Sequence, residues 1–222
     1  MPPRRRLGLL LLGALAFGLL FLSNLFHLAA DWLWFRALAF EQVFLTTLGT
    51  KLALAAGVGG LAFAVFYLNL RAAQRGVVPE PVLVRFNPEG PGVDVTRVSR
   101  RLALPVATLF ALLFGAGATG AWLGVLQFLH RTPFGAADPV FGRDIGYYVF
   151  SLPVLEGVFG LVHRLTLMSL LVVAALYVLR RDIIVSGRHV SIEPSARWHL
   201  AALAGTLFLV TALRLYVVRI PQ

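Results

Sequence analysis

Five long apolar stretches dominate the sequence and are separated by short segments that hold most of its charged residues. Each stretch is long enough to cross a bilayer as a helix, because a hydrocarbon core about 30 Å thick needs roughly 20 apolar residues. Only helices and closed barrels satisfy their backbone hydrogen bonds inside lipid. The pattern therefore predicts an all-α membrane protein, a polytopic bundle of about five transmembrane helices. The predicted helices span residues 7–30, 43–70, 102–129, 154–179 and 199–218.

The composition excludes a water-soluble domain, since 59% of the residues are hydrophobic and only 14% are charged. The formal net charge of +10 raises the question of nucleic-acid binding. The arginines, however, cluster at the ends of the apolar stretches and form no basic stripe interleaved with exposed aromatic residues. We therefore expect no nucleic-acid partner and interpret the charge as a signal for membrane topology. Cysteine is absent, which excludes disulfides and thiolate sites.

The distribution of basic residues predicts the orientation in the membrane. With a cytoplasmic N-terminus, most of the 20 lysine and arginine residues fall in the inner segments, whereas the acidic residues divide evenly. Segment 71–101 is then a cytoplasmic loop, expected to be flexible because it is rich in proline and glycine, and segment 130–153 lies outside. The first stretch exceeds the roughly 7–15 apolar residues of a signal peptide, so we expect an uncleaved first span. The predicted location is the cytoplasmic membrane of a prokaryote.

Small residues inside the third stretch match two patterns. Gly115, Gly117 and Gly120 fit the dinucleotide fingerprint G-x-G-x-x-G, but no strand precedes them and no βαβ unit surrounds them. We reject a cofactor site on that ground. Ala116, Gly120 and Gly124 instead recur every four residues, which predicts a small-residue face against which a neighbouring helix packs closely.

Two arginines, Arg164 and Arg214, fall about one turn inside the predicted outer boundary of their helices. Two interpretations remain open. Their heads can extend to the outer headgroups at little cost. Alternatively, they line an outer polar pocket that binds an anionic lipid headgroup or orients an outer domain. The acidic partners considered for that pocket are Asp144, Glu156, Asp31 and Glu41.

Catalytic and metal-binding patterns are not found in the sequence. The five histidines have no ligand spacing, and no serine lies in a nucleophile motif. We therefore expect no metal, no cofactor and no enzymatic activity. The segment before the last helix predicts a small β-hairpin at 183–192, followed by Ser195 as the helix N-cap.

Segment 130–153 is the most distinctive part of the chain because turn-forming residues alternate with aromatic ones. This pattern predicts a structured loop along the outer membrane interface. Tyr147 and Tyr148 would keep their hydroxyls in water, while Phe141 and Phe150 enter the acyl boundary. The residues selected for this signature loop are Asp138, Pro139, Phe141, Gly142, Arg143, Asp144, Gly146, Tyr147, Tyr148, Phe150 and Pro153.

Residues 138–153 resemble the signature D-P-x-F-G-R-D-x-G-F-Y-x-F-x-L-P of a bacterial and archaeal membrane family, uncharacterised protein family 0182. Residues 31–35, with Val43 and Phe44, resemble that family's first outer loop, and residues 127–129 resemble its third-helix end. Tyr147 stands where phenylalanine is usual, and residues 215–219 replace a region that often reads W-L-D-R-Y. The similarity covers essentially the whole chain.

The resemblance implies a longer protein of about seven N-terminal spans followed by a large extracytoplasmic domain, of which this chain is a part. It implies no catalytic residue and no ligand. Our leading hypothesis is a membrane anchor or scaffold for an extracytoplasmic domain or an envelope partner, in contact with the lipid bilayer. A transporter or channel component is the alternative, and an intramembrane enzyme a distant third. A polar path through the membrane midplane would favour transport.

Overall fold

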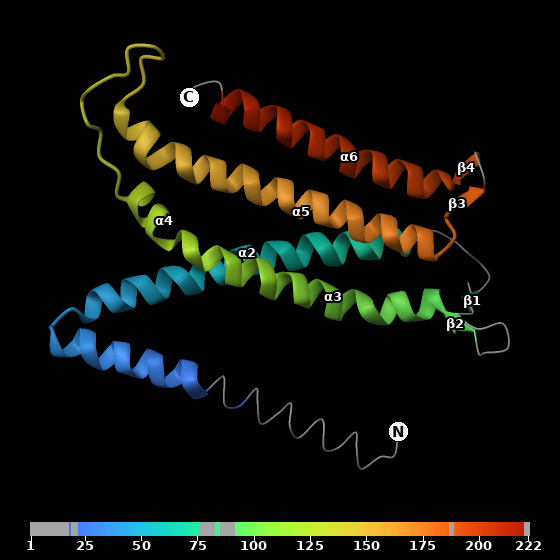
Figure 1. Ribbon diagram of the computed structural model, residues 1–222, viewed down its shortest axis with the longest axis horizontal. Coiled ribbons are helices and arrows are strands. Elements are labelled where there is room, and N and C mark those ends of the chain that lie inside the picture. Colours follow the sequence, from blue (N-terminus) through green and yellow to red (C-terminus); the bar gives the residue numbers. More distant parts are fainter. Residues whose placement is uncertain (1–17, 19–21, 76–82, 85–91, 187–188, 220–222) are drawn as a thin grey trace. The chain divides into compact units, whose positions relative to one another are not determined.

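The computed structural model of the chain describes residue 18 and residues 22–75, 83–84, 92–186 and 189–219 (Figure 1). Its contacts divide the chain into two compact units, Met1–Thr50 and Lys51–Gln222, which are described separately. Much of the first predicted span, namely residues 7–17 and 19–21, lies outside the described residues.

Four helices in the described part of the chain are long and apolar enough to cross a membrane. This confirms the prediction of an all-α polytopic membrane bundle, although which membrane it occupies stays a prediction. The elements are α2 (Glu41–Ala73), α3 (Val95–Ala118), the 3₁₀ turn η1 (Thr119–Ala121), α4 (Trp122–Leu129), the π turn η2 (Tyr147–Ser151), α5 (Leu152–Leu179), α6 (Pro194–Arg214) and the π turn η3 (Leu215–Arg219).

Several predicted loop boundaries were wrong because the helices extend beyond their most apolar parts. Helix α3 begins at Val95, inside the segment 71–101 that was predicted to be a flexible loop. The Asp94 side chain caps it by accepting from the Arg97 amide at 3.0 Å. Strands β1 (Leu83–Val84) and β2 (Val93–Asp94) pair antiparallel in the same segment. The outer loop is also shorter than predicted, since helix resumes at Tyr147.

The predicted β-hairpin is confirmed. Strands β3 (Ile183–Ser186) and β4 (His189–Ile192) pair antiparallel between α5 and α6. The predicted N-cap was wrong, because α6 already begins at Pro194 and Ser195 lies inside its first turn. Proline suits the first helical position, where no intrahelical amide bond is lost.

The first unit contains a helix over residues 22–37, a turn, and the start of α2. The residues that resemble a first outer loop therefore lie largely in helix. The Ala39 amide donates to the Arg36 carbonyl and the Phe40 amide to the Phe35 carbonyl, at 3.1 and 2.9 Å. This pair of bonds is a Schellman motif, and Ala39 adopts the positive φ of 58° that the motif requires. The turn brings Phe44 within 5.8 Å of Phe35, centroid to centroid.

The second unit has two recognisable ends. The signature loop joins α4 to α5 at one end, which we call the loop end, and the β3–β4 hairpin joins α5 to α6 at the other, the hairpin end (Figure 1). Helices α5 and α6 pack side by side between them. One buried cluster, which includes Leu70, Ala103, Val173 and Ala196, lies toward the hairpin end and draws on all four long helices.

The backbones of helices α2 and α3 lie close together at two glycines, Gly59 and Gly115. A Cβ added to Gly115 would lie 2.7 Å from the Ala55 carbonyl oxygen and 3.4 Å from the Gly59 Cα. Seven residues along α2 from Gly59, toward the hairpin end, the Phe66 ring stacks on the Phe110 ring of α3 with 3.9 Å between centroids. Glycine at these positions removes the side chains that would keep the backbones apart.

The predicted packing of a neighbouring helix on Ala116, Gly120 and Gly124 stays a prediction. Ala116 and Gly120 are exposed. A Cβ added to Gly120 or Gly124 would meet nothing within 4 Å. Helix α2 meets α3 on a different row of small residues, the one that contains Gly115.

Candidate functional site

The signature loop is organised by hydrogen bonds from its own backbone to Asp144. One carboxylate oxygen of Asp144 accepts from the Phe134 amide at 3.1 Å and from the Gly146 amide at 2.7 Å. The other oxygen accepts from the Gly135 amide at 2.9 Å. Three donors from both limbs of the loop thus converge on one side chain, which fixes the shape of the turn.

Asp138 performs a similar task at the tip of the loop. Its carboxylate accepts from the Phe141 amide at 2.6 Å and from the Tyr148 hydroxyl at 3.3 Å. Its backbone amide donates to the Arg143 carbonyl, and its carbonyl accepts from the Gly142 amide. The Tyr148 hydroxyl, which was predicted to face water, therefore has a partner inside the loop.

Three glycines of the loop have distinct geometric roles. Gly135 and Gly142 adopt positive φ values of 72° and 64°, which other residues rarely adopt. A Cβ on Gly146 would lie 2.7 Å from the Asp144 carboxylate and 3.2 Å from the Thr132 carbonyl oxygen. The glycines of the signature thus allow the turns and leave room for the carboxylate.

Ring contacts join the two limbs of the loop. Phe134 stacks on Phe150 with 5.9 Å between centroids. The Arg143 guanidinium lies 4.4 Å from the centroid of the Tyr147 ring. Val140 remains 76% exposed and Phe141 43% exposed, so the loop presents an apolar tip on a fixed frame.

The electrostatic state of Asp144 follows from these contacts. Hydrogen bonding from the Phe134 amide lowers the pKa of the Asp144 carboxyl below its usual value, partly offset by burial and reinforced by the amides of Gly146 and Gly135. Amide donors stabilise the ionised carboxylate over the neutral acid. The carboxylate is therefore charged at neutral pH.

The structure brings together only part of the predicted outer pocket. Arg214 donates from Nη2 to Glu156 Oε1 at 3.0 Å, joining α6 to α5 near the loop end. Arg164 is exposed, and its guanidinium lies beside Gly160, one turn back toward the loop end. The side chain therefore extends along α5 toward the loop end. Asp144 was wrong as a pocket member, because both of its oxygens accept amides of the loop.

A polar triad that the sequence analysis missed joins three helices toward the hairpin end. His199 of α6 places Nε2 3.0 Å from Oδ1 of Asn69 on α2. Its Nδ1 lies 2.9 Å from the Tyr177 hydroxyl on α5. Asn69 donates its amide nitrogen to the Val65 carbonyl at 2.7 Å, so its oxygen faces the imidazole. We infer that Nε2 carries the proton and that Nδ1 accepts from Tyr177.

Arg180, at the end of α5, is the second feature that was missed. It is 3% exposed, donates from Nη1 to the Ala73 carbonyl at the end of α2, and places Nε 3.4 Å from the Asp182 carboxylate. Burial raises the pKa of Asp182, an effect opposed by the charge of Arg180. The arginine thus ties the end of α2 to the start of the hairpin.

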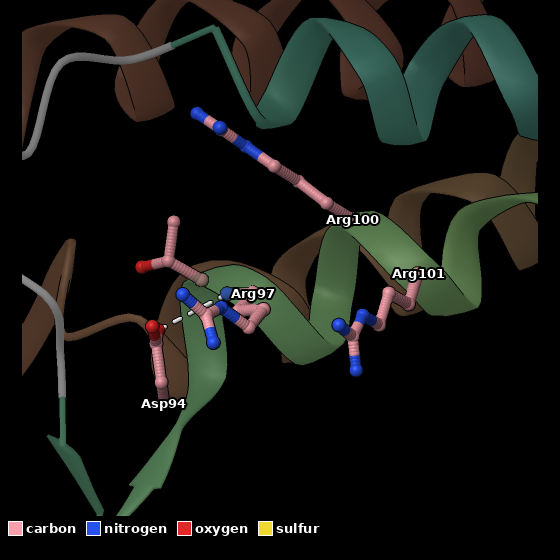
Figure 2. A pocket seen from close by; sticks show the side chains of 5 residues that line it. Asp94, Arg97, Arg100 and Arg101 are labelled. Carbon is pink, nitrogen blue, oxygen red and sulfur yellow. Dashed lines mark hydrogen bonds between the residues drawn. The ribbon is translucent and has the colours of Figure 1, made fainter.

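An open basic hollow of about 410 Å³ lies at the start of α3 (Figure 2). Arg97, Arg100 and Arg101 line it together with Asp94 and Thr96. Figure 2 shows the Arg100 side chain extending away from those of Arg97 and Arg101, so the three heads do not converge. The Arg97 amide at the start of the helix already donates a hydrogen bond to the Asp94 carboxylate. These arginines therefore do not form a converging ligand site.

A comparison with models of known protein families identifies the family of this chain. The model of the uncharacterised protein family UPF0182 matches residues 8–221. The chain belongs to this family. The curated relatives include a UPF0182 protein of Geobacter sulfurreducens, 36% identical over 84% of this chain, and one of Pelobacter propionicus, 32% identical over 88%. No solved structure matches.

This UPF0182 chain spans about a fifth of the length of its relatives, 22% of both the Geobacter and the Pelobacter proteins. A UPF0182 protein of Moorella thermoacetica is 33% identical over 84% of the chain and 21% of its own length. Most of each of those proteins therefore has no counterpart in the residues described above.

The missed residues left only weak signals in the sequence. Asn69, Tyr177 and His199 are polar residues in otherwise apolar helical stretches, where a buried polar side chain needs a partner. The histidines were weighed only as metal ligands, and the described residues contain no group of three or more His, Cys, Asp or Glu that could hold a metal. Arg180 was counted among the arginines that set topology, because nothing local shows that it is buried.

Proposed function

We propose that this chain is a membrane anchor for the larger part of its polypeptide or for an envelope protein, with the signature loop as the contact surface. The observation that carries the proposal is the loop's internal bonding: Asp138 and Asp144 fix its shape by binding its own backbone. Carboxylates engaged in this way serve structure rather than proton transfer. A rigid loop at the end of two helices is suited to positioning another domain.

The apolar tip supports the same proposal. Val140 and Phe141 are held outward on a frame fixed by aspartates and glycines, instead of folding back onto the helices. Apolar residues displayed on a rigid turn are typical of contact sites. The relatives' greater length supplies a source for the second surface within the same polypeptide. We expect the anchor to be non-enzymatic.

Photo-cross-linking in the full-length protein tests the anchor. A benzophenone on Val140→Cys, irradiated in native membranes, should yield adducts with residues beyond the present chain or with an envelope protein. Leu129→Cys is the matched control, since Leu129 is 64% exposed at the end of an apolar helix and should yield lipid adducts. Asp144→Asn should reduce the protein adducts of Val140→Cys. Lipid adducts alone from Val140→Cys would contradict the proposal.

Transport is the second candidate function, favoured by polar contacts between α5 and α6. Glu156 pairs with Arg214, and His163 Nδ1 lies 3.3 Å from the Thr211 hydroxyl. Farther along α5, Ser169 is fully buried in the middle of the helix. Polar groups inside a bundle can line a substrate path. Ion flux through proteoliposomes that is abolished by both Glu156→Gln and Arg214→Gln would favour this function over the anchor.

A further inference from the structure

The β3–β4 hairpin has one apolar face. Ile183 and Ile192 are direct cross-strand partners, so their side chains point to the same side of the hairpin. Val190 lies two residues before Ile192 and shares that side. The opposite side carries Ser191, which pairs with Ile184. Ile183, Val190 and Ile192 thus form a β-branched side, whereas the other side is mixed, with Ser191 beside Ile184, which is 52% exposed.

The apolar face is turned toward the ends of the helices. Ile183, at the base of the hairpin, packs against the buried cluster that contains Leu70 and Ala196. Its partner Ile192, also at the base, is 38% exposed, and Val190, nearer the tip, is 59% exposed, so the same face leaves the bundle along β4. Since the helices lie within the bilayer, a face directed at their ends is also directed at the bilayer surface.

The depth of the hairpin is marked by a tryptophan. Trp198 is 69% exposed and lies in the first turns of α6, about 6 Å along the axis from Pro194. Exposed tryptophan at a helix end is typical of the headgroup level of a bilayer. Ile192 precedes Pro194 by only two residues, so the hairpin begins at nearly the same depth.

Charge around the hairpin favours an anionic surface. Arg181 and Arg197 flank it and are exposed, and neither has an ion-pair partner among the residues that the structure describes. The Arg197 guanidinium lies 5.8 Å from the Trp198 ring centroid, at the same level. Glu193 is the one exposed acid of the described part of this segment. Arginines beside an apolar surface at headgroup depth suit lipid phosphates.

We propose that the Ile183, Val190 and Ile192 face of the hairpin inserts into the headgroup–acyl boundary of the bilayer, with Arg181 and Arg197 at anionic lipid phosphates. The hairpin then acts as an anchor at the membrane interface and fixes the depth of α5 and α6 in the bilayer. This role does not depend on the signature loop at the other end of the bundle. A lipid surface is the partner that best fits this face, because the face continues from the packed helix ends, at Ile183, to the exposed Val190 beside the helices.

Nitroxide labels measure this insertion. Because the present chain has no cysteine, Val190→Cys and Ser191→Cys place single labels on opposite faces of one strand, in the full-length protein with any other cysteine replaced. The protein is reconstituted in vesicles of phosphatidylcholine and phosphatidylglycerol. The Val190 label should collide severalfold more often with oxygen than with a water-soluble nickel complex, whereas the Ser191 label should show the reverse.

Two results would overturn the proposal. Preferential collision of the Val190 label with nickel would place the face in water. Protection of that label from both reagents would place it against protein. A second pair of measurements addresses charge: Arg181→Gln with Arg197→Gln should make the depth of the Val190 label in phosphatidylglycerol vesicles equal to its depth in pure phosphatidylcholine. An unchanged difference between the two vesicle types would remove the arginines from the proposal.

Discussion

The hydroxyl of Tyr177 lies 2.9 Å from Nδ1 of His199 and connects α5 to α6. On its other side the imidazole meets Asn69, so one histidine joins three helices. Apolar packing between helices is weakly directional in lipid, because the tails are as apolar as the side chains. A hydrogen-bonded triad gives the bundle a defined register that packing alone leaves loose.

The first prediction concerns this register. Tyr177→Phe leaves Nδ1 of His199 without its donor in a largely buried place and should lower the free energy of unfolding by about 1 kcal/mol. Tyr216→Phe is the matched control, because Tyr216 is 71% exposed, and it should change stability little. Denaturant unfolding of the full-length protein in mixed micelles measures both. Equal effects of the two substitutions would show that the bond contributes nothing.

The second prediction tests the close approach of α2 and α3. Gly115→Ala places a methyl group 2.7 Å from the Ala55 carbonyl oxygen and should destabilise the protein by about 1–3 kcal/mol. In Gly117→Ala, two residues along the same helix, the added methyl meets nothing within 4 Å. The same unfolding assay should show the control to be neutral or slightly stabilised. Tolerance of alanine at Gly115 would mean that the helices do not meet there.

Hydropathy alone predicted where the helices lie, because a run of neighbouring apolar residues long enough to cross a bilayer can be recognised without knowing the tertiary structure. It could not predict where each helix ends. Helix α3 starts at Val95 because Asp94 caps it, and the polar first turn of the helix hides this start in a hydropathy profile. Caps and turns depend on single side chains rather than on averages.

Partners between helices were harder to predict than the helices themselves. The spacing of Gly120 and Gly124 indicated a packing face, but the row through Gly115 makes the contact. Several rows of small residues coexist on α3, and only the facing helix decides which is used. Arg214 and Glu156 were both among the residues predicted for the outer pocket, and they form an ion pair. Asp144 was predicted for the same pocket, but its carboxylate accepts hydrogen bonds from the backbone of the signature loop. Sequence supplied the candidates, and tertiary structure selected among them.

The third prediction concerns the turn of the first unit. Ala39 adopts a positive φ of 58° at the position where Schellman motifs favour glycine. Ala39→Gly should therefore stabilise the protein by about 1 kcal/mol. Ala37→Gly, in the preceding helix, should instead destabilise it by about 1 kcal/mol. Thermal unfolding of the full-length variants compares the two, and a loss of stability with Ala39→Gly would contradict the motif.

The fourth prediction follows from the lowered pKa of Asp144. A carboxyl whose folded pKa is depressed stabilises the loop fully above its unfolded value near 3.8, and this contribution is lost as the pH falls through the folded pKa. A nitroxide on Val140→Cys should be immobile at neutral pH and gain mobility on acidification below that value. Asp144→Asn should make the label mobile at neutral pH and remove the acid step. A label whose mobility is the same at both pH values and in both proteins would show that Asp144 does not hold the loop.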